Sequence, residues 1–325
     1  MKIVEVIVDS SYEAIAHEIA EKHGTPILWQ NQKNGRHTLR LLVEPSKRQA
    51  FLDELQGHLE ASPTARILVT PVEAVLPHPK TTETEPGKKK SSLTTREELY
   101  SGVEKNAQLD GTFVVLVVLS TIVAAIGLVE DNVAVVIGAM VIAPLLGPNI
   151  ALALASTLGD RELMKQSLKT NGVGLGIAFG LSVVLGMLLP ADLESRELLS
   201  RTDVELDSIV LALASGGAAV LSLTTGLSSV LVGVMVAVAL LPPTTTLGIM
   251  LGRGDLDLAA GAALLLAVNV VSVNLSAKLT FLARGITPRT LSEKLQARQS
   301  VVVSLLVWLI SLAVLVGVIL YKKAS

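Results

Sequence analysis

The chain has 325 residues, of which 50% are hydrophobic and only 3% aromatic, and its formal net charge is −2. The mean hydropathy of +0.58 is too high for an ordinary soluble protein and fits a membrane protein that carries a soluble part. The small net charge provides no basic field for nucleic acid, and the absence of cysteine excludes disulfides and thiolate metal sites.

Residues 1–77 hold nearly all the strand-like sequence. Runs rich in β-branched residues predict strands at 2–9, 26–31, 37–44 and 65–76, and helical spacing of apolar residues fills two of the intervals between them. The resulting order βαββαβ is that of a ferredoxin-like domain. The first residues lack the basic and apolar regions of a signal peptide, so we expect this domain in the cytoplasm.

Residues 78–110 combine a polar linker with a predicted amphipathic helix. Thr94 and Thr95 each precede an acidic residue by three positions, which is a capping-box signature for a helix start. That helix would place Leu99, Val103 and Ala107 on one face. Two interpretations stay open, a helix lying on the membrane surface and a solvated connector.

The rest of the chain is dominated by uncharged runs. One of them, residues 208–252, is long enough for two spans at roughly 20 residues per crossing, so seven transmembrane helices are predicted. We group them as a first repeat at 111–191, a second repeat at 208–283 and a seventh helix at 299–321. The expected location is the inner or cell membrane, with the lipid bilayer as the first partner. The runs are 111–129, 133–158, 170–191, 208–252, 258–277 and 299–321.

An internal repeat relates the two groups of three helices. VVIGAMVIAPLLGPN (135–149) can be laid without gaps on the segment ending at Thr244, with a constant offset of 95 positions, as from Gly138 to Gly233. The same offset pairs Pro148 with Pro243 and the dipeptide at 159–160 with the one at 254–255. Chance similarity between apolar segments would not carry a proline and a Gly-Asp pair in one register.

Three spans per repeat would invert the second copy relative to the first. The loops at 158–169 and 283–298 are basic, whereas the loop at 190–207 is rich in acids. With the N-terminus inside, the positive-inside rule places the two basic loops in the cytoplasm, and only the short C-terminal tail departs from it. The sequence therefore predicts a 3+3 inverted repeat.

Each repeat carries prolines in the middle of its second span, that is, in the second and fifth helices. Proline cannot donate to the carbonyl four residues earlier, so broken helices are expected there. Opposed broken helices are a common way to build a midplane site in secondary transporters, and the alternative is a pair of kinks that only shape the bundle. The candidate solute- or ion-binding residues are Met140, Pro144, Gly147, Pro148, Asn149, Val238, Ala239, Pro242, Pro243, Thr244, Thr245, Asn269 and Asn274.

Other residues in the spans have simpler interpretations. Lys278 lies near the end of the sixth helix and is expected to extend its amine to the membrane surface. No acid or base is then expected deep in a span, which favours a neutral solute, or an ion held by carbonyls and hydroxyls. Gly172, Gly176 and Gly180 form two GxxxG steps and are predicted to pack closely against another helix.

The sequence predicts no enzyme. It contains no nucleophile elbow, Walker loop or HExxH motif. His17 and His23 are six residues apart and do not share a helix face, so we expect neither a metal site nor a cofactor.

The stretches TREELY, LSTIVAAIGLVEDNVAVVIGAMVIAPLLGPN, LGDRELMKQSL and LTTGLSSVLVGVMVAVALLPP closely resemble the bacterial and archaeal membrane-protein family catalogued as domain of unknown function 389. The resemblance covers about residues 94–285, and many members carry a similar N-terminal region. It implies a fold but no activity, so no binding or catalytic residue is carried over from it.

Two functions compete. The first is a secondary transporter or channel for a small solute or ion, gated or assembled by the cytoplasmic domain. The second is a membrane sensor or scaffold that does not transport and whose cytoplasmic domain binds a ligand or a protein. A homo-oligomer is expected in either case, from the glycine-rich helix faces and the extra seventh helix.

Overall fold

The computed structural model describes residues 2–33, 35–44, 47–72, 95–188, 195–225, 229–286 and 291–324, with the side chains of 71, 229–239, 291–301 and 323–324 left out. The chain forms two compact units, Met1–Arg96 and Glu97–Ser325. Each is described by itself below.

The first unit is a four-stranded antiparallel sheet with two helices. Its elements are β1 (Lys2–Asp9), α1 (Glu13–Lys22), β2 (Ile27–Lys33), β3 (Arg36–Val43), α2 (Arg48–Leu59) and β4 (Arg66–Pro71), and the strand order is β2-β3-β1-β4. The predicted order of strands and helices is confirmed. Alternate residues of the central strands face the two helices, so Val4, Val6 and Val8 of β1 are buried against Phe51 and Leu55 of α2.

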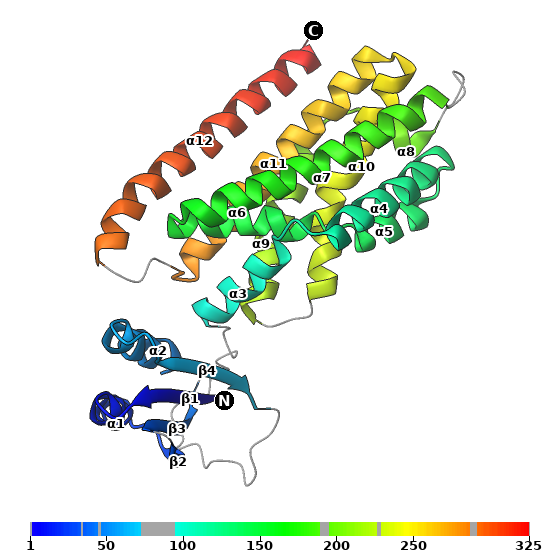
Figure 1. Ribbon diagram of the computed structural model, residues 1–325. Coiled ribbons are helices and arrows are strands. Elements are labelled where there is room, and N and C mark those ends of the chain that lie inside the picture. Colours follow the sequence, from blue (N-terminus) through cyan, green and yellow to red (C-terminus); the bar gives the residue numbers. More distant parts are fainter. Residues whose placement is uncertain are drawn as a thin grey trace, which may run out of the picture. The chain divides into compact units, whose positions relative to one another are not determined.

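The second unit is entirely helical among its described residues (Figure 1). Five of its helices are long and apolar enough to cross a membrane, or six if α5 and α6 are one bent span. A count of seven would also require α10 and stays a prediction. The helices are α3 (Arg96–Asn106), α4 (Gly111–Val129), α5 (Val133–Ile142), α6 (Leu146–Leu158), α7 (Arg161–Leu188), α8 (Arg196–Leu199), α9 (Leu206–Thr225), α10 (Ser229–Arg253), α11 (Leu256–Ala283) and α12 (Leu291–Ala324).

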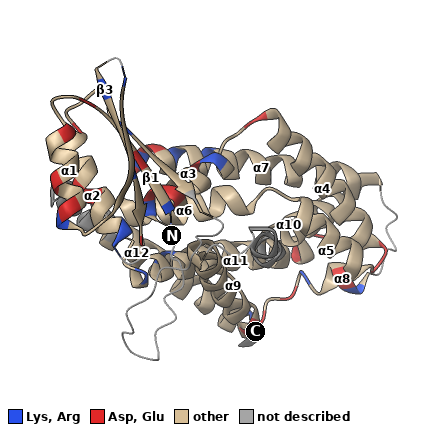
Figure 2. Ribbon diagram, turned by 90° about the horizontal axis from the view of Figure 1, so that it is seen from below, with Lys and Arg blue, Asp and Glu red and all other residues tan. Residues whose placement is uncertain are grey.

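Charged residues of this unit concentrate near helix ends and in connecting segments (Figure 2). The middle of α4 illustrates the pattern, since its 19 residues contain no acid or base. Such helices satisfy their backbone groups internally and expose apolar side chains, as lipid requires.

The break between α5 and α6 is where the prolines predicted it. Ala143 leaves the helical region, with φ −65° and ψ 125°, and the two helices meet at 56°. The cause is Pro144, because a proline ring disfavours the helical conformation of the residue before it. Pro148 has a different role, since it lies in the first turn of α6, where its missing N–H would have had no intrahelical acceptor.

The second predicted break is wrong. α10 is one continuous helix from Ser229 to Arg253 with Pro242 and Pro243 inside it. The repeat explains the difference, because the residue 95 positions after Pro144 is Ala239, which imposes no restriction on its neighbour. Prolines inside a membrane helix are tolerated when neighbouring helices cover the freed carbonyls, and α10 packs against α4, α5, α7, α9 and α11.

Helix boundaries follow the offset of 95 residues. α4 and α9 begin at Gly111 and Leu206, and α7 and α11 each have 28 residues, starting at Arg161 and Leu256. The preceding helices α6 and α10 end before glycines with positive φ, Gly159 at 74° and Gly254 at 86°. Only glycine adopts this left-handed conformation without strain, so the same local signal ends both helices.

Glycines bring α7 and α10 into close contact. A Cβ atom on Gly248 would overlap Ser182, and one on Gly252 would overlap the carbonyl of Val183. Residues further along α10 thus meet residues further along α7, so these helices run parallel.

Gly172, Gly176 and Gly180, which were predicted to pack closely against another helix, do not do so within this unit. A Cβ at any of the three would meet no atom within 4 Å in this unit, because all three lie on the exposed side of α7. The GxxxG spacing is visible in sequence, whereas the direction in which that helix face points depends on the packing of the whole bundle.

These contacts predict opposite effects of two equivalent substitutions. Gly248→Ala should lower the free energy of unfolding by about 1–3 kcal/mol, since the new methyl group forces α7 and α10 apart. Gly176→Ala, the matched control, should raise it by about 0.5–1 kcal/mol because alanine favours the helix. Thermal unfolding in detergent measures both, and a higher Tm for Gly248→Ala would contradict the close packing.

Candidate functional site

Two predicted site residues meet inside the helical unit. Asn149, in the first turn of α6, and Asn274, on α11, are 2% and 1% exposed. Nδ2 of Asn274 donates to Oδ1 of Asn149 at 2.8 Å and to the carbonyl of Val270 at 2.9 Å. An amide pair thus joins α6 to α11 directly after the break at Pro144.

The pair leaves two polar atoms unmet. Nδ2 of Asn149 and Oδ1 of Asn274 are buried and have no partner among the described residues. Buried amide groups are almost always hydrogen-bonded, and each unmet donor or acceptor costs about 1–3 kcal/mol. One buried donor and one buried acceptor therefore stay without a partner among the described residues.

The hydroxyls of α10 add further polar groups. Thr244 donates to the carbonyl of Leu240 at 2.7 Å, whereas the buried hydroxyls of Thr245 and Thr246 have no partner among the described residues. Since α10 packs on both α6 and α11, these threonines belong to the same helical core as the asparagine pair.

The other candidate residues vary in position. Met140 and Pro148 are buried beside the break, and Asn269 is 8% exposed on α11. Pro242 and Pro243 lie inside α10 rather than at a break. Val238 and Ala239 are outside the residues whose side chains the structure describes.

Lys278 corrects the sequence interpretation. Its side chain does not reach the membrane surface but is fully buried, with 0% exposure. Its Nζ donates to the carbonyl of Ser156 on α6 at 3.1 Å and to the hydroxyl of Ser304 on α12. The expectation that no base lies inside the helical core is therefore wrong. The sequence held one indication of this burial. Lys278 follows Asn274 by four residues on α11, so the two side chains share one face of that helix.

Helix α3 also contacts the start of α6, next to the break. The carbonyl of Asn106, at its end, lies so close to Gly147 that no side chain would fit there. Tyr100 Oη donates to the carboxylate of Asp160 at 2.6 Å, and burial together with this carboxylate raises the pKa of Tyr100. The amphipathic prediction for α3 is met, as Leu99 and Val103 are buried against residues of α6, α9 and α11.

Asp131 joins two segments outside the spans. It has φ 54° and accepts hydrogen bonds from the Ser195 hydroxyl at 2.6 Å and the Glu197 amide at 2.8 Å. These donors, the amide first, hold the pKa of its carboxyl below the usual range. Asp131 thus connects the α4–α5 turn to α8 and the residue before it.

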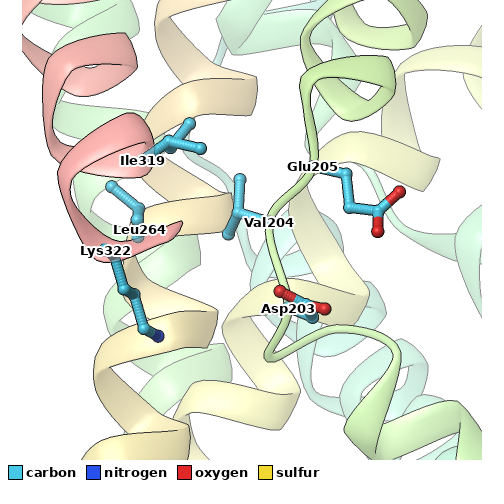
Figure 3. Close-up of a pocket in the computed structure, with 6 residues that line it drawn as sticks. All are labelled: Asp203, Val204, Glu205, Leu264, Ile319 and Lys322. Carbon is cyan, nitrogen blue, oxygen red and sulfur yellow. The ribbon is translucent and has the colours of Figure 1, made fainter. Parts of the chain in front are cut away.

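A pocket lies elsewhere, between the segment before α9 and helices α11 and α12. Figure 3 shows Asp203 and Glu205 on that segment and Lys322 on α12. Val204, Leu264 and Ile319 provide its apolar lining. It contains none of the predicted site residues. Among the described residues, no group of three or more His, Asp or Glu could hold a metal ion.

These features define a membrane protein built on several apolar spanning helices, with a small antiparallel sheet domain before them. Residues 140–275 match the family model described as a domain of unknown function, DUF389. The chain is also 36% identical over 306 residues, 94% of each chain, to an uncharacterized protein of Methanocaldococcus jannaschii. The chain belongs to the DUF389 family. No solved structure matches it significantly.

The asparagine pair makes a prediction about coupling. Asn149→Leu and Asn274→Leu should each lower the free energy of unfolding by about 1–3 kcal/mol, since each leaves one amide buried without its partner. The loss of unfolding free energy in the double variant should be smaller than the sum of the two single losses, by about 0.5–2 kcal/mol. Unfolding in mixed micelles measures the cycle, and strictly additive losses would show that the two amides do not interact.

The burial of Lys278 predicts protection from chemical modification. An amine-acetylating reagent should modify Lys322, which is exposed, and leave Lys278 unmodified in the folded protein. Denaturation should make both react, because protection depends on the folded core. Peptide mass spectrometry measures the extent of acetylation, and equal modification of both lysines in folded protein would contradict the burial.

Proposed function

We propose that this protein is a secondary transporter or channel for a small solute or ion. The observation that carries the proposal is the buried Asn149–Asn274 pair beside the break between α5 and α6, with one donor and one acceptor that have no partner among the described residues. Irregular backbone inside a membrane is stable only against protein or a water-filled cavity, and polar groups placed there mark substrate pathways.

The helix directions support an inverted repeat. α7 runs parallel to α10, and α11 runs parallel to α6, since Asn149 meets Asn274 while Ser156, further along, meets Lys278. α10 and α11 are joined by a tight turn at Gly254 and pack side by side in opposite directions (Figure 1). α7 and α11, equivalents under the 95-residue offset, therefore run in opposite directions. Inverted repeats with a site at their interface are common in secondary transporters.

The site favours a solute with both donor and acceptor groups, or an ion that keeps some of its water. Neither asparagine carries a charge, and the threonines of α10 offer only hydroxyls. Lys278 lies one turn beyond Asn274 and adds a buried amine at one end of this polar line.

The first unit would lie in the cytoplasm, as the basic loops indicate, and would regulate the site or assemble subunits. Helix α3 supports this, because it begins where the first unit ends and its last residues contact Gly147 at the start of α6. A ligand that moves the first unit would act on the break through α3. We propose the cell membrane as its location and a homo-oligomer as its assembly.

Transport is tested with purified protein in liposomes on a solid-supported membrane, with rapid jumps of single ions and small solutes. One solute should give a saturating current. Asn149→Leu should raise the half-saturating concentration roughly tenfold, since a lost hydrogen bond to a buried amide costs about 1–3 kcal/mol. Ser215→Ala, whose exposed hydroxyl only bonds Leu211 of its own helix, is the matched control and should leave the current unchanged.

A folded protein that gives no current across a broad panel would contradict transport. The competing hypothesis, a sensor or scaffold whose first unit binds a ligand, would then gain support. A current that Asn149→Leu does not alter would keep transport but remove the asparagine pair from the pathway.

A further inference from the structure

Three side chains of the first unit lie in a row that no sequence motif indicated. Nε2 of His37 lies 3.2 Å from Oγ of Ser10, and Nδ1 of His37 lies 2.8 Å from Oε1 of Glu13. A hydroxyl, an imidazole and a carboxylate thus follow one another at hydrogen-bond distance. This order, a nucleophile bonded to a base that a third group orients, is the general arrangement of nucleophilic catalysis.

Local structure explains how the three residues meet. Ser10 directly follows β1, and Glu13 opens α1 three residues later, so one strand-turn-helix connection carries both. His37 is the second residue of β3 and lies opposite Val8, near the end of β1. The turn between β1 and α1 therefore reaches over the ring of His37.

The exposure of the three side chains indicates which one is the nucleophile and which one is the base. The side chain of His37 is 11% exposed and that of Glu13 36%, whereas Ser10 is exposed. The Glu13 carboxylate, 2.8 Å from Nδ1, favours a proton on that nitrogen, and Nε2 is the ring nitrogen that faces the Ser10 hydroxyl. The nucleophile is thus open to solvent while its base is held in place.

Ser10 has one competing acceptor. Its Oγ also lies 3.3 Å from the carbonyl of Gly35, slightly further than from His37. A hydroxyl rotates freely between two such acceptors, so the hydrogen bond to His37 is available without backbone movement.

The start of α1 lies next to the nucleophile. Its N-cap residue, Tyr12, makes no side-chain capping hydrogen bond. The first amide groups of any helix lack intrahelical acceptors, and the helix dipole favours negative charge at that end. The N–H of Tyr12 donates to the carbonyl of Asp9 at 2.9 Å, so the N–H groups of Glu13 and Ala14, in the first turn of the helix, are the candidate donors for a developing oxyanion.

We propose that Ser10, His37 and Glu13 form a nucleophilic site for acyl transfer from small carboxylic esters. Ser10 Oγ bonds the acyl carbon while its proton passes to His37 Nε2, and the ester C–O bond then breaks as the leaving alcohol takes that proton. Water next adds to the acyl-serine, giving its proton to His37, which returns it to Ser10 as the carboxylic acid leaves. Ester and water become acid and alcohol. Glu13 is a positioning residue, because it acts only through His37.

A fluorophosphonate probe tests the nucleophile directly, because Ser10 Oγ would bond phosphorus and displace fluoride, with the proton leaving through His37. Full-length protein in detergent is incubated with the probe, and the adduct is located by peptide mass spectrometry. Ser10→Ala should abolish labelling, while Ser11→Ala, the adjacent exposed serine, should label at the unaltered rate. His37→Gln should slow labelling by about 100-fold.

Glu13 needs a measurement that separates orientation from folding. Glu13→Gln should slow labelling, and Glu13→Asp should restore part of the rate, because only a carboxylate orients the imidazole. Thermal unfolding of the same samples checks that each variant is folded. Labelling no faster than in heat-denatured protein, or labelling that persists in Ser10→Ala, would overturn the proposal. Hydrolysis of p-nitrophenyl acetate that depends on Ser10 would extend it from adduct formation to turnover.

Discussion

The restriction that Pro144 places on Ala143 governs the interior of the helical unit. A spanning chain in lipid must satisfy its backbone groups within the protein, so a break in the helix has to be enclosed by other helices. The surroundings of the break meet this need, since Leu145 packs with Phe113 of α4, Leu241 of α10 and Ala178 of α7 in one apolar cluster. Asn106 closes the opposite side at Gly147. The polar pair at Asn149 lies directly beyond this enclosed point.

The two halves of the helical unit differ at their equivalent prolines. Pro148 and Pro243 are equivalent in the repeat, but only the first half has a proline four residues earlier. One half therefore bends by 56° between α5 and α6, whereas the other keeps α10 continuous. A transporter site formed this way would be asymmetric, with a free helix start on one side and an unbroken helix with threonine hydroxyls on the other. The contact of α3 with Gly147 also falls in the half that contains the break.

For Lys278 and for the Ser10, His37 and Glu13 side chains, contacts with residues distant in sequence determine the environment of the polar group. Lys278 was expected at the surface because lysine stems can extend along a helix to water. Ser156 and Ser304, from two other helices, provide oxygens inside the core instead. In the first unit, residues 10, 13 and 37 are unremarkable in sequence, and antiparallel pairing of β1 with β3 brings them together.

Local chemistry determined what the sequence predicts correctly. The apolar runs define the spans, period-two and helical patterns define βαββαβ, and Pro144 defines the break through its own ring. Gly159 and Gly254 end their helices because only glycine tolerates that backbone conformation. Tertiary structure alone decided that Gly248 rather than Gly176 contacts a neighbouring helix, that Asn149 meets Asn274, and that Lys278 is buried. Each of these depends on which residues of another helix lie opposite, and a one-dimensional pattern does not contain that information.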